Sequence, residues 1–360
     1  MTQRERYLRT VRFEDVDHPP FWADWIASTT LERWHREGFP EDVHIEDYFG
    51  FERMENVPIN LGLVPPFKVE TLEETDKYRV FRDSDGSLRK QFKDYSGFGM
   101  PQWLEYPIKD GDYWERFKER LNPESPCRYP PERKWEEMKF LWSRRDYPLA
   151  VPAGSFYGWV RNWVGMENLA YLFYDDPDLV HEMMDYIADF VIRTIHRALD
   201  EVDVDVAIFW EDMCYKTGPL ISPDMFREFL LPRYKKVTSF LREHGVRLCW
   251  VDSDGRIDQL VPLWIEGGVN GLYPLEVAAG VDAVRLREEY GRQIVMWGNI
   301  DKRALAKGKE EIDREFRRVE RLVEDGGYIP LVDHAIPDDV PYENYLYYLK
   351  RKREMFGMGC

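Results

Sequence analysis

From about residue 146 onward, short apolar runs alternate with longer amphipathic ones, and this alternation constrains the fold more than any other feature of the chain. The apolar runs that we expect to form strands are residues 148–153, 204–210, 246–251, 269–273, 294–297 and 328–332. The helical patterns between them carry start signals, such as Pro223 directly after Ser222. A strand followed by a helix, repeated several times, indicates parallel strands joined by right-handed crossovers.

The alternation extends to the amino-terminal part, where the apolar stretch 20–25 precedes the helix-like TTLERWHREG. We therefore expect an α/β fold, a (β/α)8 TIM barrel formed by the whole chain, 1–360, as a single domain with an elaborated amino-terminal region. Between residues 51 and 146 the pattern breaks down. There we expect an insertion or elaboration of the barrel, with a β-hairpin turned at Asp85-Gly86 and a short helix in DYWERFKERL.

The charge balance narrows the class of partner. Acidic residues number 67 and basic residues 50, and the formal net charge of -17 disfavours nucleic acid and anionic membranes as partners. We expect a small-molecule substrate. The start MTQRERYLRT has no apolar run of signal-peptide length, no later run approaches the ~20 apolar residues of a membrane helix, and the four cysteines form no CxxC pair. These features favour a soluble cytoplasmic protein, and a homodimer is an open alternative for its assembly.

Polar side chains follow five of the expected strands at the point where each strand ends. They are Glu211 and Asp212, Asp252 and Asp254, Glu276, Asn299 and Asp301, and Asp333 and His334. In a parallel barrel these strand ends share one face, which is where barrel enzymes keep their active sites. We predict that Glu211, Asp252, Asp254 and His334 are catalytic, and that the other five bind the substrate.

Each of these residues also has an ordinary structural alternative. Asp301 is placed to cap a helix, and Asp254 is placed to form a turn. Glu211 is a candidate ion-pair partner of Arg161 or Lys216, and His334 is a candidate structural histidine. For any one residue these alternatives stay open. Polar groups at five strand ends of one barrel are nevertheless difficult to explain by solvation alone, so together they favour a site.

Aromatic side chains accompany the same strand ends. The residues that we expect to wall a wide pocket around the acids, and to bind the substrate there, are Trp22, Trp25, Tyr157, Trp159 and Trp210. Arg161 is a further candidate for substrate binding. Such a wall suits a flat or bulky ligand. Tryptophan also fills cores because of its size, and for each single residue that alternative remains.

Two long stretches resemble a known superfamily. GGVNGLYPLEVAAGVDAVRLREEYGRQIVMWGNIDKRALAKG and DGGYIPLVDHAIPDDVPYENY look like the uroporphyrinogen decarboxylase superfamily, as does the glycine-and-aromatic run GSFYGWVRNWVG. The superfamily contains the decarboxylase of haem synthesis and the methylcobamide:coenzyme M methyltransferases, and its fold is a (β/α)8 barrel. The resemblance covers most of the chain from about Asp146 onward.

The chain departs from both branches of that superfamily, which identifies it as an atypical member. Methyltransferase members bind zinc through a His-x-Cys-Gly motif after one strand and a Cys after the last. Here these positions hold Asp252-Ser253-Asp254-Gly255 and His334, so both sulfur ligands are missing. Decarboxylases clasp the substrate's carboxylates with an arginine-rich loop after the first strand. Here that loop is ADWIASTT, which has no arginine before Arg33.

The resemblance and these departures lead to a metal hypothesis. Asp252, Asp254, His334 and Glu211 would offer oxygen and nitrogen ligands, which suit zinc, manganese or magnesium. The same acids would also suit a cationic or hydroxylated substrate without a metal.

The expected function follows from the resemblance. The leading hypothesis is a methyltransferase-like enzyme, metal-assisted or linked to a corrinoid that a partner protein supplies, acting on an unidentified small molecule. One alternative is a cofactor-free decarboxylase of a porphyrinogen-like or other carboxylated substrate, with Asp252 or His334 as general acid. Another is a non-catalytic ligand-binding barrel. The convergence of so many titratable groups favours an enzyme over a binding protein.

Overall fold

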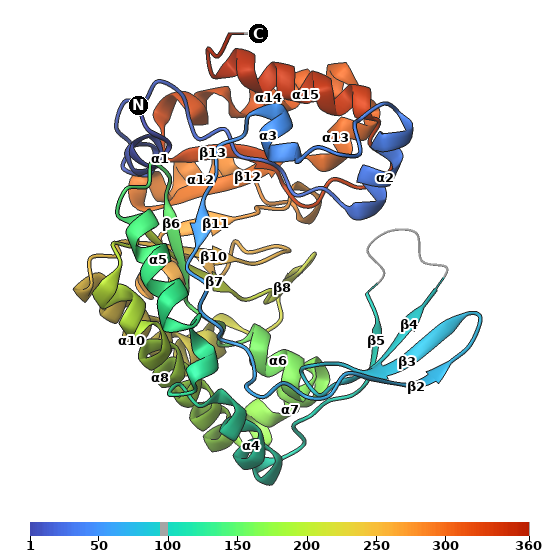
Figure 1. The fold of residues 1–360 in the computed structure, drawn as a ribbon, viewed down its shortest axis with the longest axis vertical. Coiled ribbons are helices and arrows are strands. Elements are labelled where there is room, and N and C mark those ends of the chain that lie inside the picture. The colour runs from blue at the N-terminus through green and yellow to red at the C-terminus, as the bar shows by residue number, and fades with distance from the viewer. Residues whose placement is uncertain (94–99, 360) are drawn as a thin grey trace.

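The centre of the molecule is a curled, seven-stranded parallel sheet, seen in a computed structural model that describes residues 1–93 and 100–359 (Figure 1). In spatial order the strands are β1 (Glu55–Asn56), β6 (Leu149–Pro152), β7 (Val206–Trp210), β10 (Leu248–Asp252), β11 (Gly271–Tyr273), β12 (Val295–Ile300) and β13 (Tyr328–Val332). Every neighbouring pair is parallel. The six strands expected after residue 146 are all present, although most are shorter than their apolar runs.

Helices cover the outside of the sheet. Those of the carboxyl-terminal part are α6 (Gly158–Val164), α7 (Met166–Asp175), α8 (Pro177–Glu201), α9 (Pro223–Met225), α10 (Leu231–Glu243), α11 (Val261–Glu266), α12 (Ala283–Tyr290), α13 (Lys302–Lys307), α14 (Lys309–Asp325) and α15 (Tyr342–Met355). Short helical turns are η4 (Val277–Ala279) and η5 (Gly291–Gln293). In α14 the buried side chains are Ile312, Phe316, Val319 and Leu322, the spacing of one helical face turned towards the sheet.

The long helix expected after Ser222 is interrupted. A π-helical turn, η3 (Phe226–Leu230), separates α9 from α10. Pro232 lies two residues after the end of this turn, and it has no N–H to donate to the carbonyl four residues earlier. The missing hydrogen bond explains why the regular helix does not run through this point.

The apolar stretch 20–25, expected from the sequence to continue the alternation, does not form a regular ladder. Instead, Trp22 makes a single parallel bridge to Glu52, and Ile26 makes one to Ile336. Glu52 precedes β1 and Ile336 follows β13, the two edge strands of the sheet. The bridges therefore place the segment between the two edges. The Asp24 side chain accepts a hydrogen bond from the Val332 amide at 2.7 Å, where a regular strand would use a backbone carbonyl. The structure thus has seven regular barrel strands, and a complete eight-stranded ladder is not formed within the described residues.

The helix α1 (Gln3–Val11) covers the amino-terminal ends of the strands. Its Tyr7 is fully buried, and the Tyr7 hydroxyl accepts a 2.9 Å hydrogen bond from Nε1 of Trp250 in β10. A Cβ atom on Gly271 would lie 2.4 Å from the Trp250 ring, so only glycine leaves room for this indole. With that end covered, the carboxyl ends of the strands remain as the open mouth.

The region 51–146 contains elements of two kinds. An antiparallel sheet of β2 (Glu70–Glu74), β3 (Tyr78–Arg82), β4 (Leu88–Phe92) and β5 (Gln102–Glu105) projects from the main body (Figure 1). The predicted hairpin around Asp85-Gly86 is confirmed by the pairing of β3 with β4, and the predicted short helix is α4 (Gly111–Lys118). By contrast, β1 belongs to the main sheet.

The remaining elements are short or lie at the periphery. They are α2 (Ser28–Arg36), α3 (Ile45–Phe49), α5 (Glu132–Trp142), η1 (Glu119–Leu121), η2 (Pro126–Arg128), β8 (Cys214–Tyr215) and β9 (Gly218–Pro219). Over the residues that the structure describes, no helix has the length and apolar character needed to cross a membrane.

Candidate functional site

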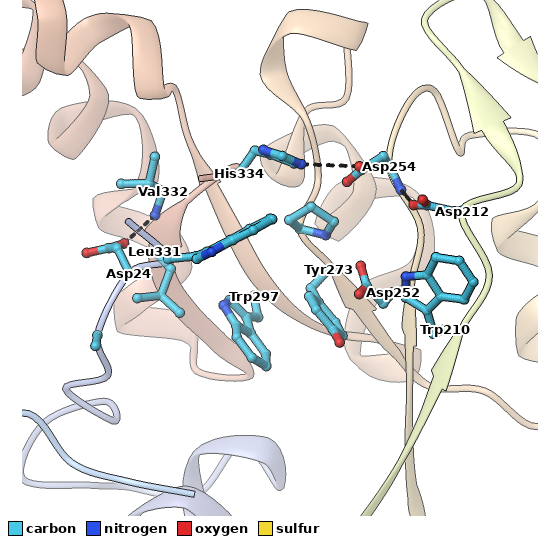
Figure 2. Close-up of a pocket in the computed structure, with 13 residues that line it drawn as sticks. Asp24, Trp210, Asp212, Asp252, Asp254, Tyr273, Trp297, Leu331, Val332 and His334 are labelled. Carbon is cyan, nitrogen blue, oxygen red and sulfur yellow. Dashed lines mark hydrogen bonds and ion pairs between the residues drawn. The ribbon is translucent and has the colours of Figure 1, made fainter. Parts of the chain in front are cut away.

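A cavity of about 240 Å³ lies at the carboxyl ends of the strands (Figure 2). Its polar lining consists of Asp24, Asp212, Asp252, Asp254 and His334. Its aromatic lining consists of Trp25, Trp210, Tyr273 and Trp297. Most of these residues were expected at strand ends from the sequence, and the structure brings them to one place.

Strand register explains why three of them meet. Asp252 pairs with Trp210 on one side and with Tyr273 on the other. Paired residues of neighbouring parallel strands point to the same face of a sheet. The interior residue Trp250 lies two positions before Asp252 in β10, so all three side chains point into the curled sheet at the level of the strand ends.

Three carboxylates repel one another in this cavity. Burial, followed by the charges of Asp254 and Asp212, raises the pKa of Asp252 from 3.8 to about 7. Burial and the charge of Asp254 also raise the pKa of Asp212. Asp252 therefore holds or releases a proton close to neutral pH, which is the property expected of a general acid or base.

His334 carries the only imidazole among the cavity's described lining residues. Its Nε2 atom lies 3.2 Å from Oδ2 of Asp254, and this contact is the main reason that the pKa of His334 is raised (Figure 2). The Asp254 backbone N–H is in turn 3.5 Å from Oδ1 of Asp212. The loops after β7, β10 and β13 are thus joined through side chains.

Aromatic rings line the cavity on several sides. Tyr273 and Trp297 stack with their centroids 4.4 Å apart and their planes at 9°. Trp25 is 59% exposed, and its ring centroid lies 5.2 Å from that of His334. Because the rings come from β7, β11, β12 and the segment around Asp24, the cavity has aromatic surface on several sides.

One polar lining residue, Asp24, was not predicted. It is buried, and its Oδ1 atom accepts hydrogen bonds from the Val332 amide and the Tyr348 hydroxyl. Burial raises the pKa of Asp24 and lowers that of the fully buried Lys352 to about 8. The Lys352 ammonium donates a 3.0 Å hydrogen bond to the Trp22 carbonyl.

This site lies within a chain whose sequence matches a known family. The family model of uroporphyrinogen decarboxylase (URO-D) matches residues 146–355. The chain belongs to the uroporphyrinogen decarboxylase family. The resemblance found in the sequence is confirmed, and it begins where the strand–helix alternation begins.

Members of the URO-D family from several bacteria are similar over most of the chain. The uroporphyrinogen decarboxylase of Mannheimia succiniciproducens is 27% identical over 95% of this chain and 94% of its own length. That of Xanthomonas campestris pv. campestris (strain B100) is 23% identical over 88% of this chain and 86% of its own length. A methyltransferase from Methanosarcina mazei has a similar fold, with a TM-score of 0.62, 17% identity and 99% of both chains covered.

Within this URO-D fold, the structure does not bring Glu211 to the cavity. Its buried carboxylate accepts hydrogen bonds from the Ser155 hydroxyl, the Tyr234 hydroxyl and the backbone N–H groups of Phe156, Tyr157 and Gly158. Because Trp210 points into the curled sheet, its neighbour Glu211 points away from the interior, towards the start of α6. Strand alternation in the sequence was the signal for this placement.

Four of the predicted substrate-binding residues hold loops of the URO-D fold in place. Asp301 caps α13 by accepting from the Arg303 N–H at 2.9 Å. Buried Asn299 donates to the carbonyls of Leu275 and Val281. The remaining two accept backbone N–H bonds: Asp333 accepts them from Val277 and Lys302, and Glu276 accepts one from Gly255. Burial raises the pKa of Asp333 to about 6.

The other predicted wall residues lie around the cavity and are not part of its described lining. Trp22 packs below it, with its ring 5.2 Å from that of Trp297. Tyr157 is buried in the surrounding core, and Trp159 packs 5.9 Å from Trp163. Arg161 donates a hydrogen bond to the Asp212 carbonyl and thereby holds a residue whose φ of 47° is left-handed.

The ligand atoms of the four predicted metal ligands do not point to a common position. Among the described residues, the one group of at least three potential ligands with all ligand atoms within 4.8 Å of one another is His196, Asp200 and His244, at the outer helices α8 and α10. Asp252, Asp254 and His334 do not form such a group, and Glu211 faces elsewhere. The donor geometry thus gives no support to a metal in the cavity.

Proposed function

We propose that this URO-D family member is a methyltransferase-like enzyme that acts on a small, neutral or cationic molecule at the strand-end cavity. The observation that carries the proposal is the charge of the lining. Asp24, Asp212, Asp252 and Asp254 contribute carboxyl groups, whereas no lysine or arginine is found among the lining residues that are described. The proposal treats residues 21–26 as an irregular counterpart of the first strand of a (β/α)8 barrel.

A porphyrinogen is a poor match for this cavity. Porphyrinogen substrates carry several carboxylates, and close contact with Asp212, Asp252 and Asp254 would be repulsive. The volume of about 240 Å³ also lies below the range of roughly 300–1,000 Å³ that holds drug-sized ligands. Both arguments favour a small substrate without multiple negative charges.

A carboxyl group of the chain would donate the proton that methyl transfer requires. In a methyl transfer, the bond between the methyl carbon and a substrate heteroatom breaks, and the electron pair stays on the heteroatom. Asp252, with its pKa of about 7, is a donor from which that heteroatom takes a proton. A reduced corrinoid carried by a partner protein would supply the nucleophile that accepts the methyl group. Asp254 orients His334 and raises the pKa of its imidazole.

Decarboxylation is the second candidate, because the same proton on Asp252 would serve to protonate a carbanion. The two functions differ in what they consume. A test incubates the purified protein with small methylated compounds and cob(I)alamin as methyl acceptor, and follows cobalamin methylation by absorbance. Parallel reactions with small carboxylic acids measure released carbon dioxide.

The parent protein is expected to methylate cobalamin, and Asp252→Asn to reduce the rate by ~10²- to 10⁴-fold. Asp200→Asn removes an exposed carboxylate outside the cavity and is expected to retain the parent rate. Carbon dioxide release that depends on Asp252, without methyl transfer, would establish the decarboxylase instead. Ligand binding with neither reaction would indicate a non-catalytic barrel.

A further inference from the structure

The cavity combines two features that recognise a positive charge without hydrogen bonds. Trp25, Trp210, Tyr273 and Trp297 supply aromatic rings from four separate parts of the chain. The faces of such rings attract cations, and aromatic cages are a known means of binding quaternary ammonium groups. Aromatic surface alone would also suit a neutral apolar ligand, so the charges must decide between these ligands.

The charges around the cavity leave an excess of negative groups. The charge of the buried Lys352 favours the ionised form of Asp24, although no ion pair within 4.0 Å joins these two described residues. Asp254 has His334 at 3.2 Å, and Asp212 has the Arg161 guanidinium at 3.9 Å from outside the cavity. For Asp252 no ion pair within 4.0 Å is found among the described residues.

The groups that face Asp252 from the neighbouring elements reinforce this point. Asp212 after β7 and Asp254 after β10 both act on it as like charges, whereas the Tyr273 hydroxyl and His334 favour its ionised form. The repulsive groups prevail over the attractive ones. A cation in the cavity would relieve this repulsion and favour ionised Asp252.

The type of cation follows from the geometry of the donors. A divalent metal needs several oxygen or nitrogen atoms around one point, and these side chains do not offer that arrangement. A primary ammonium is strongly hydrated and needs acceptors for its three N–H groups. A methylated ammonium has a diffuse charge and an apolar surface, so it suits aromatic rings with carboxylates at a greater distance.

We propose that the cavity binds a small methylated ammonium compound, with its charged nitrogen between the aromatic rings and the carboxylates of Asp252 and Asp254. As a statement about the substrate, this inference rests on the proposed methyl transfer. The binding itself does not depend on that chemistry. After a methyl group has left a methylated ammonium, the amine keeps the electron pair and takes its proton from water, because Asp252 is ionised while the cation is bound.

The test compares two ligands of the same shape. Choline has a positively charged nitrogen where 3,3-dimethylbutan-1-ol has a neutral carbon. Calorimetry on the purified protein measures the affinity of each compound. Choline is expected to bind at least about tenfold more tightly than the neutral compound. Equal affinities, or no detectable binding of choline, would overturn the inference.

Variants identify the site of binding. Asp254→Asn and Trp210→Leu are each expected to weaken choline binding about tenfold or more. Asp254→Asn is expected to have little effect on the binding of 3,3-dimethylbutan-1-ol, which has no charge. Trp210→Phe, which keeps a ring, should recover part of the affinity. Asp200→Asn is the matched surface control and should bind choline like the parent. Choline binding that is unchanged in Asp254→Asn and Trp210→Leu would place it outside this cavity and overturn the inference.

Two further measurements separate this inference from the proposed function. Competition of choline by Mg²⁺ or Zn²⁺ at equal concentration would point to a metal site and overturn the inference. Charge-dependent choline binding with no methylation of cob(I)alamin by any donor would support the ligand class and contradict methyl transfer. Methylation by neutral donors, without inhibition by choline, would support methyl transfer and contradict the ligand class.

Discussion

The Nε2 atom of His334 lies 3.2 Å from Oδ2 of Asp254, so that a side chain after the last strand is paired with one after β10. This pairing raises the pKa of His334, and the imidazole keeps its proton to higher pH than an isolated histidine does. The positive charge of His334 also partly offsets the repulsion among the cavity carboxylates.

Asp254→Asn should lower the pKa of His334, because the neutral amide removes the main group that favours the imidazolium form. Proton NMR of the imidazole ring would follow this titration in the parent and the variant, with Asp200→Asn as the control variant. An unchanged His334 titration in the variant would show that Asp254 does not control its protonation.

Asp252 should make the protein less stable as the pH rises. Its folded pKa of about 7 lies above the usual 3.8, so between these values the folded state binds more protons than the unfolded state. Stability from this group is therefore present at low pH and is lost as the pH rises from about 4 to about 7, at up to ~1.4 kcal/mol per pH unit.

The matching variant is Asp252→Asn, which has no carboxyl group to ionise. Relative to the parent, it should gain stability between pH 5 and pH 8, measured by urea unfolding at both values. Asp200→Asn should show no such gain. A difference between parent and Asp252→Asn that stays constant with pH would contradict the raised pKa.

The fold and part of the site were accessible from the sequence because both depend on local patterns. Apolar runs located the parallel strands, and the rule that strand ends share a face brought Asp212, Asp252, Asp254 and His334 together. The same alternation, applied one step further, would have turned Glu211 away from the cavity.

Other features depend on contacts that no local pattern encodes. Asp24 and Lys352 are 328 positions apart, and Lys352 lies in the run KRKRE, where a lysine is normally expected to be exposed. The replacement of a regular first strand by single bridges is another example. It depends on the Asp24 side chain taking the Val332 amide, which only the folded arrangement reveals.

Lys352→Met should destabilise the fold, because it removes the hydrogen bond to the Trp22 carbonyl and the charge that favours ionised Asp24. A hydrogen bond from a charged group contributes about 1.5–3 kcal/mol. The double variant Asp24→Asn/Lys352→Met should recover part of that loss, and a full cycle of urea unfolding would measure the coupling. Additive effects of the two single variants would mean that the groups do not interact.

Glu211→Gln is the variant that separates a structural from a catalytic role at a residue whose position in the sequence suggests catalysis. Its carboxylate accepts five hydrogen bonds, from two hydroxyls and three backbone N–H groups. A glutamine would place an NH₂ group against some of these donors, at a cost of about 1–3 kcal/mol for each group left unsatisfied. We therefore expect a lower urea midpoint, while the folded fraction keeps the parent's choline affinity.

Choline affinity is measured at low urea, and circular dichroism gives the folded fraction in the same samples. Together they separate a loss of stability from a loss of ligand binding. A stable Glu211→Gln protein with impaired ligand binding would return Glu211 to the functional site.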